Sequence, residues 1–324
     1  MILRRRPRLE SGAFAQDSAP RRSLWGSTAL SGLAGQGTVQ MTVGTALKRA
    51  AALLAEAGAA DARLEAELLL ADLLSRRRLD LYCHPDDALA PPMVARFSEA
   101  VRRRLGGEPL HYVRGWVEFD DLTIDVAPGV LIPRPETELL ARHAAAHLLT
   151  VKAPRFIDVG TGSGCVAIAL ARAVEAAVGL AIDSSAQALA VARRNVVNHG
   201  LGARVRLMRG DLCEAVGMKA SVDLIAANLP YVPTAAIAGL EPHVRDWEPR
   251  AALDGGLDGL TLIERLLQTA GPVLSSRGRL MLEIGAGQSP RVAAMARAYG
   301  WTMRAVVPDL AGIDRVVELS RWTK

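Results

Sequence analysis

The stretch Asp158-Val159-Gly160-Thr161-Gly162-Ser163-Gly164 decides the fold of this chain. It follows an apolar run at 155–159 and precedes an apolar segment at 165–173 that has the length of a helix. Glycines in a turn between a strand and a helix let a ligand approach the backbone, and the helix N-terminus offers free N–H groups. Ligands bind at the carboxyl ends of the strands in open α/β sheets. We therefore expect an α/β domain whose ligand site lies at this loop.

Apolar runs and helical segments alternate from this point to the end of the chain. The rhythm predicts a Rossmann-like, mostly parallel seven-stranded sheet with helices on both faces. The short segment between the last two runs predicts an antiparallel pair at the sheet edge. The predicted strands are 155–159, 178–182, 204–208, 222–227, 278–284, 302–307 and 315–319.

Three aspartates stand at the ends of the first three predicted strands. Asp158 can attract an ammonium group, and Asp183, 23 residues after Gly160, can accept hydrogen bonds from ribose hydroxyls. Asp211 is placed to read an adenine amino group. Each aspartate alone could be an ordinary helix cap, but the three together behind a glycine loop favour S-adenosylmethionine (SAM). The predicted cofactor-binding residues are Asp158, Gly160, Thr161, Gly162, Ser163, Gly164, Asp183, Asp211, Leu212 and Asn228.

The tetrapeptide Asn228-Leu229-Pro230-Tyr231 follows the predicted strand at 222–227. The asparagine side chain offers one acceptor oxygen and two donors, and Pro230 holds the preceding residue extended. Tyr231 adds a flat wall, so the four residues can grip a planar group that carries an NH2. An ordinary exit from a strand into a proline turn is the other interpretation. Beside a SAM site, the tetrapeptide predicts a methyl-acceptor site for an amide or an adenine.

The first 133 residues divide into three parts. Residues 1–40 are rich in Arg and Ser without periodicity, which predicts a disordered leader: either a transit peptide or a stretch that precedes a true start at Met41. Residues 41–110 have helical periodicity and predict a small all-helical domain, with Asp61 as a helix cap and Pro91 at the start of a third helix. Residues 111–133 switch to period two, which predicts a β-hairpin linker with its turn at Asp120-Asp121. The methyltransferase domain would then span 134–324.

Composition excludes several classes of protein. Residues 1–40 contain six of the 39 basic and two of the 34 acidic residues, so the rest of the chain has 33 basic and 32 acidic residues. This near-neutral body argues against stable nucleic-acid binding. The three cysteines are far apart, which indicates a reducing compartment and no metal site, and no apolar run reaches the length of a membrane span. We expect a cytoplasmic monomer, or a protein of the mitochondrial matrix if residues 1–40 are a transit peptide.

The chain resembles the PrmC/HemK family, the protein-(glutamine-N5) methyltransferases of class I peptide chain release factors. The resemblance runs from about residue 45 to 320 and includes the glycine loop, the tetrapeptide and segments at 107–112, 248–253 and 282–285. Its most specific part is Leu131-Ile132-Pro133-Arg134-Pro135-Glu136-Thr137-Glu138. The family usually has Asn-Pro-Pro-Tyr, so Leu229 is a departure that leaves only Pro230 to restrain the backbone.

The resemblance implies a class I SAM-dependent methyltransferase that modifies the glutamine of a Gly-Gly-Gln motif. Asn228 and the Leu229 carbonyl would accept the two amide N–H bonds, and Tyr231 would pack against the amide plane. Arg134 and Glu136 would shape the entrance, and the helical domain would grip a remote surface of the release factor. Two alternatives stay open at this point: an adenine-N6 methyltransferase acting on rRNA or DNA, and a non-catalytic SAM-binding assembly module. The predicted catalytic and substrate-binding residues are Asn228, Leu229, Pro230 and Tyr231, with Arg134 and Glu136 also binding substrate.

Overall fold

The computed structural model describes residues 40–214, 216 and 221–321. The predicted leader at 1–40 therefore lies outside the described residues, apart from its last position. In the described residues, no helix is long and apolar enough to cross a membrane.

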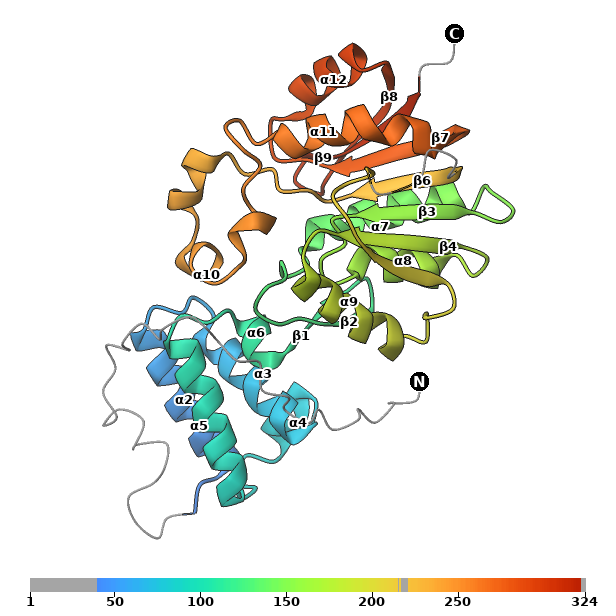
Figure 1. Ribbon diagram of the computed structural model, residues 1–324. Coiled ribbons are helices and arrows are strands. Elements are labelled where there is room, and N and C mark those ends of the chain that lie inside the picture. Colours follow the sequence, from blue (N-terminus) through green and yellow to red (C-terminus); the bar gives the residue numbers. More distant parts are fainter. Residues whose placement is uncertain (1–39, 215, 217–220, 322–324) are drawn as a thin grey trace.

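Five helices form the first structural unit, which lies below the sheet in Figure 1. They pack around their own apolar core, which includes Leu47, Leu70 and Phe97. The predicted helix at Pro91 is confirmed. Asp61 lies at the predicted N-cap position, but its side chain makes no capping hydrogen bond, so that expectation was wrong. The helices are α2 (Val43–Glu56), α3 (Ala62–Leu74), α4 (Arg78–Cys83), α5 (Pro91–Leu105) and α6 (Leu110–Arg114).

Two arginine clusters lie on this helical unit, at 76–78 and 102–104, and neighbouring acids pair with the arginines of both. In the first cluster, Arg78 pairs with the buried Glu67. In the second, Arg104 pairs with Glu65 of α3. The other pairs are Arg76–Asp87, Arg77–Asp80, Arg102–Glu99 and Arg103–Glu108. These arginines therefore stabilise the fold of the helical unit and form no free basic stripe.

A β-hairpin follows the helical unit, as predicted, although it begins later than expected. Strands β1 (Trp116–Phe119) and β2 (Leu122–Asp125) pair antiparallel across Asp120 and Asp121, whose φ angles are 48° and 60°. Two consecutive left-handed residues make the turn that suits the twist of a hairpin. Residues 111–114, assigned to period two from the sequence, instead belong to the short helix α6, which ends where Gly115 adopts a φ of 82°.

Seven strands form one sheet in the order β5-β4-β3-β6-β7-β9-β8. The first five in this order are parallel, and β9 is antiparallel to both of its neighbours. The seven-stranded sheet and the antiparallel edge pair are thus confirmed. The strands are β3 (Arg155–Val159), β4 (Val178–Asp183), β5 (Val205–Arg209), β6 (Val222–Ala227), β7 (Leu274–Glu283), β8 (Trp301–Pro308) and β9 (Asp314–Arg321).

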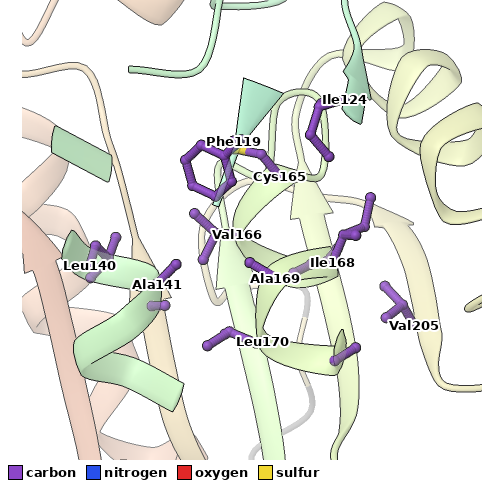
Figure 2. Packing of buried hydrophobic residues seen from close by; sticks show 14 of the residues in the cluster. Phe119, Ile124, Leu140, Ala141, Cys165, Val166, Ile168, Ala169, Leu170 and Val205 are labelled. Carbon is purple, nitrogen blue, oxygen red and sulfur yellow. The ribbon is translucent and has the colours of Figure 1, made fainter. Parts of the chain in front are cut away.

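Helices cover both faces of the sheet (Figure 1). One face carries α7 (Pro135–Leu148), α8 (Cys165–Ala173) and α9 (Ala186–Asn198), and the other carries α11 (Thr261–Ala270) and α12 (Ser289–Ala298). Figure 2 shows Phe119 and Ile124 of the hairpin beside the α8 residues, so the hairpin belongs to the core of the first face.

The strand ends that carry the predicted site lie level with one another. Val159 pairs with both Ile182 and Ala227, so the loops after β3, β4 and β6 leave the sheet side by side. The chain from β6 to α11 makes a long excursion with the short helix α10 (Pro242–Arg245). This excursion reaches the helical unit, where a Cβ on Gly107 would stand 3.4 Å from the Trp247 indole nitrogen.

Candidate active site

The glycine loop between β3 and α8 has a backbone that only glycine adopts easily. Gly160, Gly162 and Gly164 have φ angles of 72°, 56° and 85°. The N–H groups of Gly160 and Thr161 both donate to the Ile182 carbonyl at 2.9 Å, which joins the loop to the end of β4. The result is a rigid, side-chain-poor turn at the carboxyl edge of the sheet.

Asp158 lies beneath this loop with 2% of its surface exposed. Its Oδ2 accepts hydrogen bonds from Thr161 Oγ1 at 2.6 Å and from the Ala167 N–H at 3.1 Å. Burial raises the pKa of Asp158 from 3.8 to about 6, against the lowering effect of these two bonds. Oδ1 accepts no hydrogen bond from any described residue. The carboxylate therefore keeps one oxygen for a cationic group, at the bottom of the loop.

A hollow opens over this carboxylate. It is lined by the loop, by Asn228 and by the segment before α7. Ser163 Oγ is buried in it and finds no hydrogen-bond partner of ordinary geometry among the described residues. The lining residues are Leu131, Pro133, Thr137, Asp158, Gly160, Thr161, Gly162, Ser163, Cys165, Val166 and Asn228. These groups fit the amino acid arm of SAM. Asp158 can bind an ammonium group, the Ser163 hydroxyl can donate to a carboxylate, and the glycine loop leaves room for both.

The other two predicted acids lie outside this lining. Asp183 ends β4, and its oxygens accept hydrogen bonds from the N–H groups of Gly162 and Ser185, both at 2.9 Å. A carboxylate has about four lone-pair sites, so hydroxyl donors can still bind it. Asp211 is half exposed and pairs with Arg265 of α11 at 2.8 Å. Leu212 beside it is buried with a φ of 49°.

The tetrapeptide leaves the sheet next to the glycine loop. Asn228 Nδ2 donates to Thr137 Oγ1 at 2.9 Å, and no described residue donates to its Oδ1. Leu229 is buried, and a Cβ on Gly160 would stand 3.1 Å from its Cδ2. The Asn228 amide thus has a fixed orientation, with its oxygen available toward the hollow that Asn228 lines.

Tyr231 is held at both ends. Its carbonyl accepts a hydrogen bond from Gln288 Nε2 at 3.0 Å, and its hydroxyl donates to Glu283 Oε1 at 3.3 Å. Burial is the main cause that raises the Tyr231 pKa, so the phenol stays protonated and remains a donor. Glu283 at the end of β7 is itself buried, and burial raises its pKa from 4.5 to about 7.

The predicted entrance residues have different surroundings. Arg134 is extended between its two prolines, as expected, and its guanidinium pairs with the buried Glu248. Glu248 also accepts the Ile132 N–H at 3.2 Å, so it fastens the segment before α7 to the excursion after β6. Glu136 lies in the first turn of α7 and is partly exposed.

Four supporting residues were not assigned a role from the sequence: Thr137, Asn195, Glu248 and Glu283. Asn195 of α9 is buried and makes three hydrogen bonds, to the Ser163 carbonyl and to both backbone groups of Asp125. It therefore ties the glycine loop to the hairpin. Glu283 could have been found from the sequence, because it is an acid at the end of a predicted strand, like the three aspartates assigned to SAM.

Comparisons with known proteins agree with this geometry. Residues 45–115 match the family model described as PrmC N-terminal domain, and residues 156–245 match a methyltransferase domain model. The release factor glutamine methyltransferase of Geobacter sulfurreducens is 43% identical over 82% of this chain and 91% of its own length. The protein of the same name from Moorella thermoacetica is 43% identical over 85% and 97%.

The chain belongs to the release factor glutamine methyltransferase family. The predicted resemblance is thereby confirmed, and so is the class I methyltransferase fold. A crystal structure of a release factor-specific protein-(glutamine-N5) methyltransferase from Alicyclobacillus acidocaldarius is 30% identical. It covers 61% of this chain and 99% of its own, with a TM-score of 0.36.

Proposed function

We propose that this chain uses SAM to methylate the side-chain amide nitrogen of the glutamine in the Gly-Gly-Gln motif of class I peptide chain release factors. The observation that carries the proposal is the Asn228 amide, whose nitrogen is held by Thr137 and whose oxygen is left for an incoming donor. A planar NH2 group is the donor that such an acceptor suits. Family membership supports glutamine over adenine, and Asn228, Asp183 and the glycine loop together support catalysis over a purely binding role.

The residues of the tetrapeptide orient and stabilise the acceptor nitrogen. An amide nitrogen is a weak nucleophile because its lone pair is delocalised, so its position relative to the methyl group decides the rate. SAM supplies an electrophilic methyl group on its sulfonium sulfur. The Asn228 oxygen and the Leu229 carbonyl accept the two N–H bonds and stabilise the positive charge that develops on nitrogen. The methylated nitrogen then loses its extra proton readily, and no strong base is required.

The loops at the carboxyl edge hold the cofactor. Asp158 Oδ1 accepts the ammonium group of the methionine arm, and Ser163 Oγ donates to its carboxylate. Asp183 accepts the ribose hydroxyls. Asp211 and Leu212 contact the adenine.

Recognition of the release factor is shared with the helical unit, residues 41–110. Arg134 and Glu136 border the entrance for the glutamine. Because the arginines of the two clusters are paired and the body is nearly neutral, we expect a protein partner and no stable nucleic-acid binding.

Mass spectrometry of a release factor incubated with the protein and SAM tests the proposal. The Gly-Gly-Gln peptide should gain one methyl group, and Asn228→Ala should abolish the gain. Asn198→Ala is the control, since Asn198 lies on the exposed side of α9 and its side chain donates to Asp125, away from the tetrapeptide. Labelled methyl that appears on RNA and not on the peptide would overturn the proposal.

A second experiment tests the helical unit. A variant that lacks residues 41–107 and still binds SAM should fail on the intact release factor but methylate a free Gly-Gly-Gln peptide. Equal rates of the truncated and full chains on the intact factor would contradict a recognition role.

A further inference from the structure

Glu283 is a buried acid that the proposed chemistry does not use. It is the last residue of β7 and pairs with Val316 of β9, with 1% of its surface exposed. One oxygen accepts the Tyr231 hydroxyl, and the other, Oε2, is buried without a hydrogen-bond partner among the described residues. A buried carboxylate with an unsatisfied oxygen destabilises a fold, and an apolar residue would cost less there. The acid therefore has a role other than stability.

The Tyr231 hydroxyl connects Glu283 to one end of the tetrapeptide, because it donates to Oε1. Thr137 accepts from the Asn228 amide at the other end at 2.9 Å. Its hydroxyl also lowers the pKa of Glu283, although no hydrogen bond of ordinary geometry joins the two side chains in the described residues. The tetrapeptide is thus bound to this carboxylate through Tyr231.

Three contacts restrain Tyr231: one on its ring, one on its carbonyl and one on its hydroxyl. A Cβ on Gly285 would stand 3.2 Å from its Cδ2, so the ring rests against bare backbone on that side. Its carbonyl is held by Gln288. The hydroxyl bond to Glu283 fixes the far end of the side chain.

We propose that Glu283 is a positioning residue for methyl transfer: it orients Tyr231 through the tyrosine hydroxyl, so that the tetrapeptide receives the glutamine amide in one geometry. This inference rests on the proposed function and adds to it a residue that touches neither the methyl donor nor the acceptor.

The charge state of Glu283 changes near neutral pH. Burial raises its pKa to about 7, since it outweighs the two hydroxyls that lower it. When ionised, the acid accepts the Tyr231 hydroxyl as a carboxylate; when protonated, one of its oxygens carries the proton and the bond to Tyr231 is weaker. Raising the pH through about 7 should therefore improve the orientation of the tetrapeptide. The groups facing Glu283 are Tyr231, Thr137, Glu136, which raises its pKa, Arg315, which lowers it, and Cys165, whose pKa it helps to raise.

The test compares Glu283→Gln with the parent enzyme on an intact release factor, with kcat, KM and SAM affinity measured from pH 6 to 9. We expect the parent kcat to rise through about pH 7, and the variant to lack this rise. At pH 8 the variant kcat should fall about fivefold or more, while SAM affinity stays within about twofold. Glu318→Gln is the matched control, because Glu318 lies on the neighbouring strand and pairs with Arg279 and His143, away from the tetrapeptide. It should keep the parent profile.

A Glu283→Gln enzyme with the parent kcat and the parent pH profile would overturn the inference. If that variant fails to fold, Tyr231→Phe removes the same hydrogen bond, and retention of the parent pH profile in it would overturn the inference equally. Failure of the proposed function is a different result, since the parent enzyme itself would then leave the Gly-Gly-Gln peptide unmodified.

Discussion

Replacing Asp158 by Asn should weaken SAM binding without lowering the stability of the protein. The amide oxygen of Asn can still accept from Thr161 Oγ1 and the Ala167 N–H, so the loop keeps its two hydrogen bonds. The amide NH2 then takes the place of Oδ1 and faces the hollow. In the variant, an uncharged N–H donor would therefore face the ammonium group of SAM, which in the proposed site is bound by Oδ1 of Asp158.

The two expected effects have opposite signs. Burial raises the pKa of Asp158 from 3.8 to about 6, so the folded state binds this proton more tightly than the unfolded state does. The stability that this proton contributes is present below pH 3.8 and is lost as the pH rises through about 6. At pH 8 the buried charge costs on the order of 3 kcal/mol, which Asn removes. The lost charge-assisted hydrogen bond to the cofactor is worth about 1.5–3 kcal/mol, a weakening of SAM binding of roughly 10- to 150-fold.

Calorimetric titration with SAM and thermal unfolding of the cofactor-free protein at pH 8 measure both effects. Asp158→Asn should bind SAM more weakly and melt no lower than the parent. Methylthioadenosine, which lacks the amino acid arm, should bind both proteins alike. Asp223→Asn is the control, because Asp223 accepts the Arg155 N–H at the opposite edge of the sheet. A change in SAM affinity of less than about threefold would refute the assignment of Oδ1 to the ammonium group.

Three further substitutions follow from single contacts. Gly160→Ala should weaken SAM binding about tenfold in a titration, because the residue has a φ of 72° and its Cβ would crowd the Leu229 side chain at 3.1 Å. Asn195→Ala should lower the free energy of unfolding by about 1–3 kcal/mol in urea, because the buried Ser163 carbonyl and two partly buried backbone groups of Asp125 each lose a hydrogen bond. Glu67→Gln should weaken the pairs of this residue with Arg63 and Arg78 and so lower the free energy of unfolding of the helical unit by about 1–3 kcal/mol. The loss should appear as a lower melting temperature, while SAM affinity stays unchanged.

Local patterns in the sequence predict those parts of the fold that local forces determine. The apolar runs ended by glycine or aspartate became strands within a few residues of their predicted bounds, and Asp120-Asp121 formed the predicted turn. The short helices α4 and α6 were missed, because one or two turns leave too little periodicity to distinguish from a loop.

The contacts that support the site could not be predicted in the same way, because they join residues far apart in the chain. Asn195 contacts Asp125 across 70 positions, and Asn228 contacts Thr137 across 91. Arg134 was assigned to the entrance from the family resemblance, and its partner Glu248 lies 114 positions away. A polar side chain of this kind shows its role only when the fold brings its partner beside it.

Leu229 shows how packing can replace a local restraint. The family usually has proline here, which restricts the backbone of the unfolded chain and stabilises a compatible fold by about 0.4–1 kcal/mol. Leu229 is 4% exposed and lies in the core cluster on the α11 face of the sheet, with its Cδ2 close to the bare Gly160. Full burial of a leucine contributes about 1.5–3 kcal/mol. The buried side chain therefore supplies a packing restraint where the family usually has the restraint of a ring. The Leu229 carbonyl, which we propose accepts the glutamine amide, has Pro230 on one side and the contact of the Leu229 side chain with Gly160 on the other.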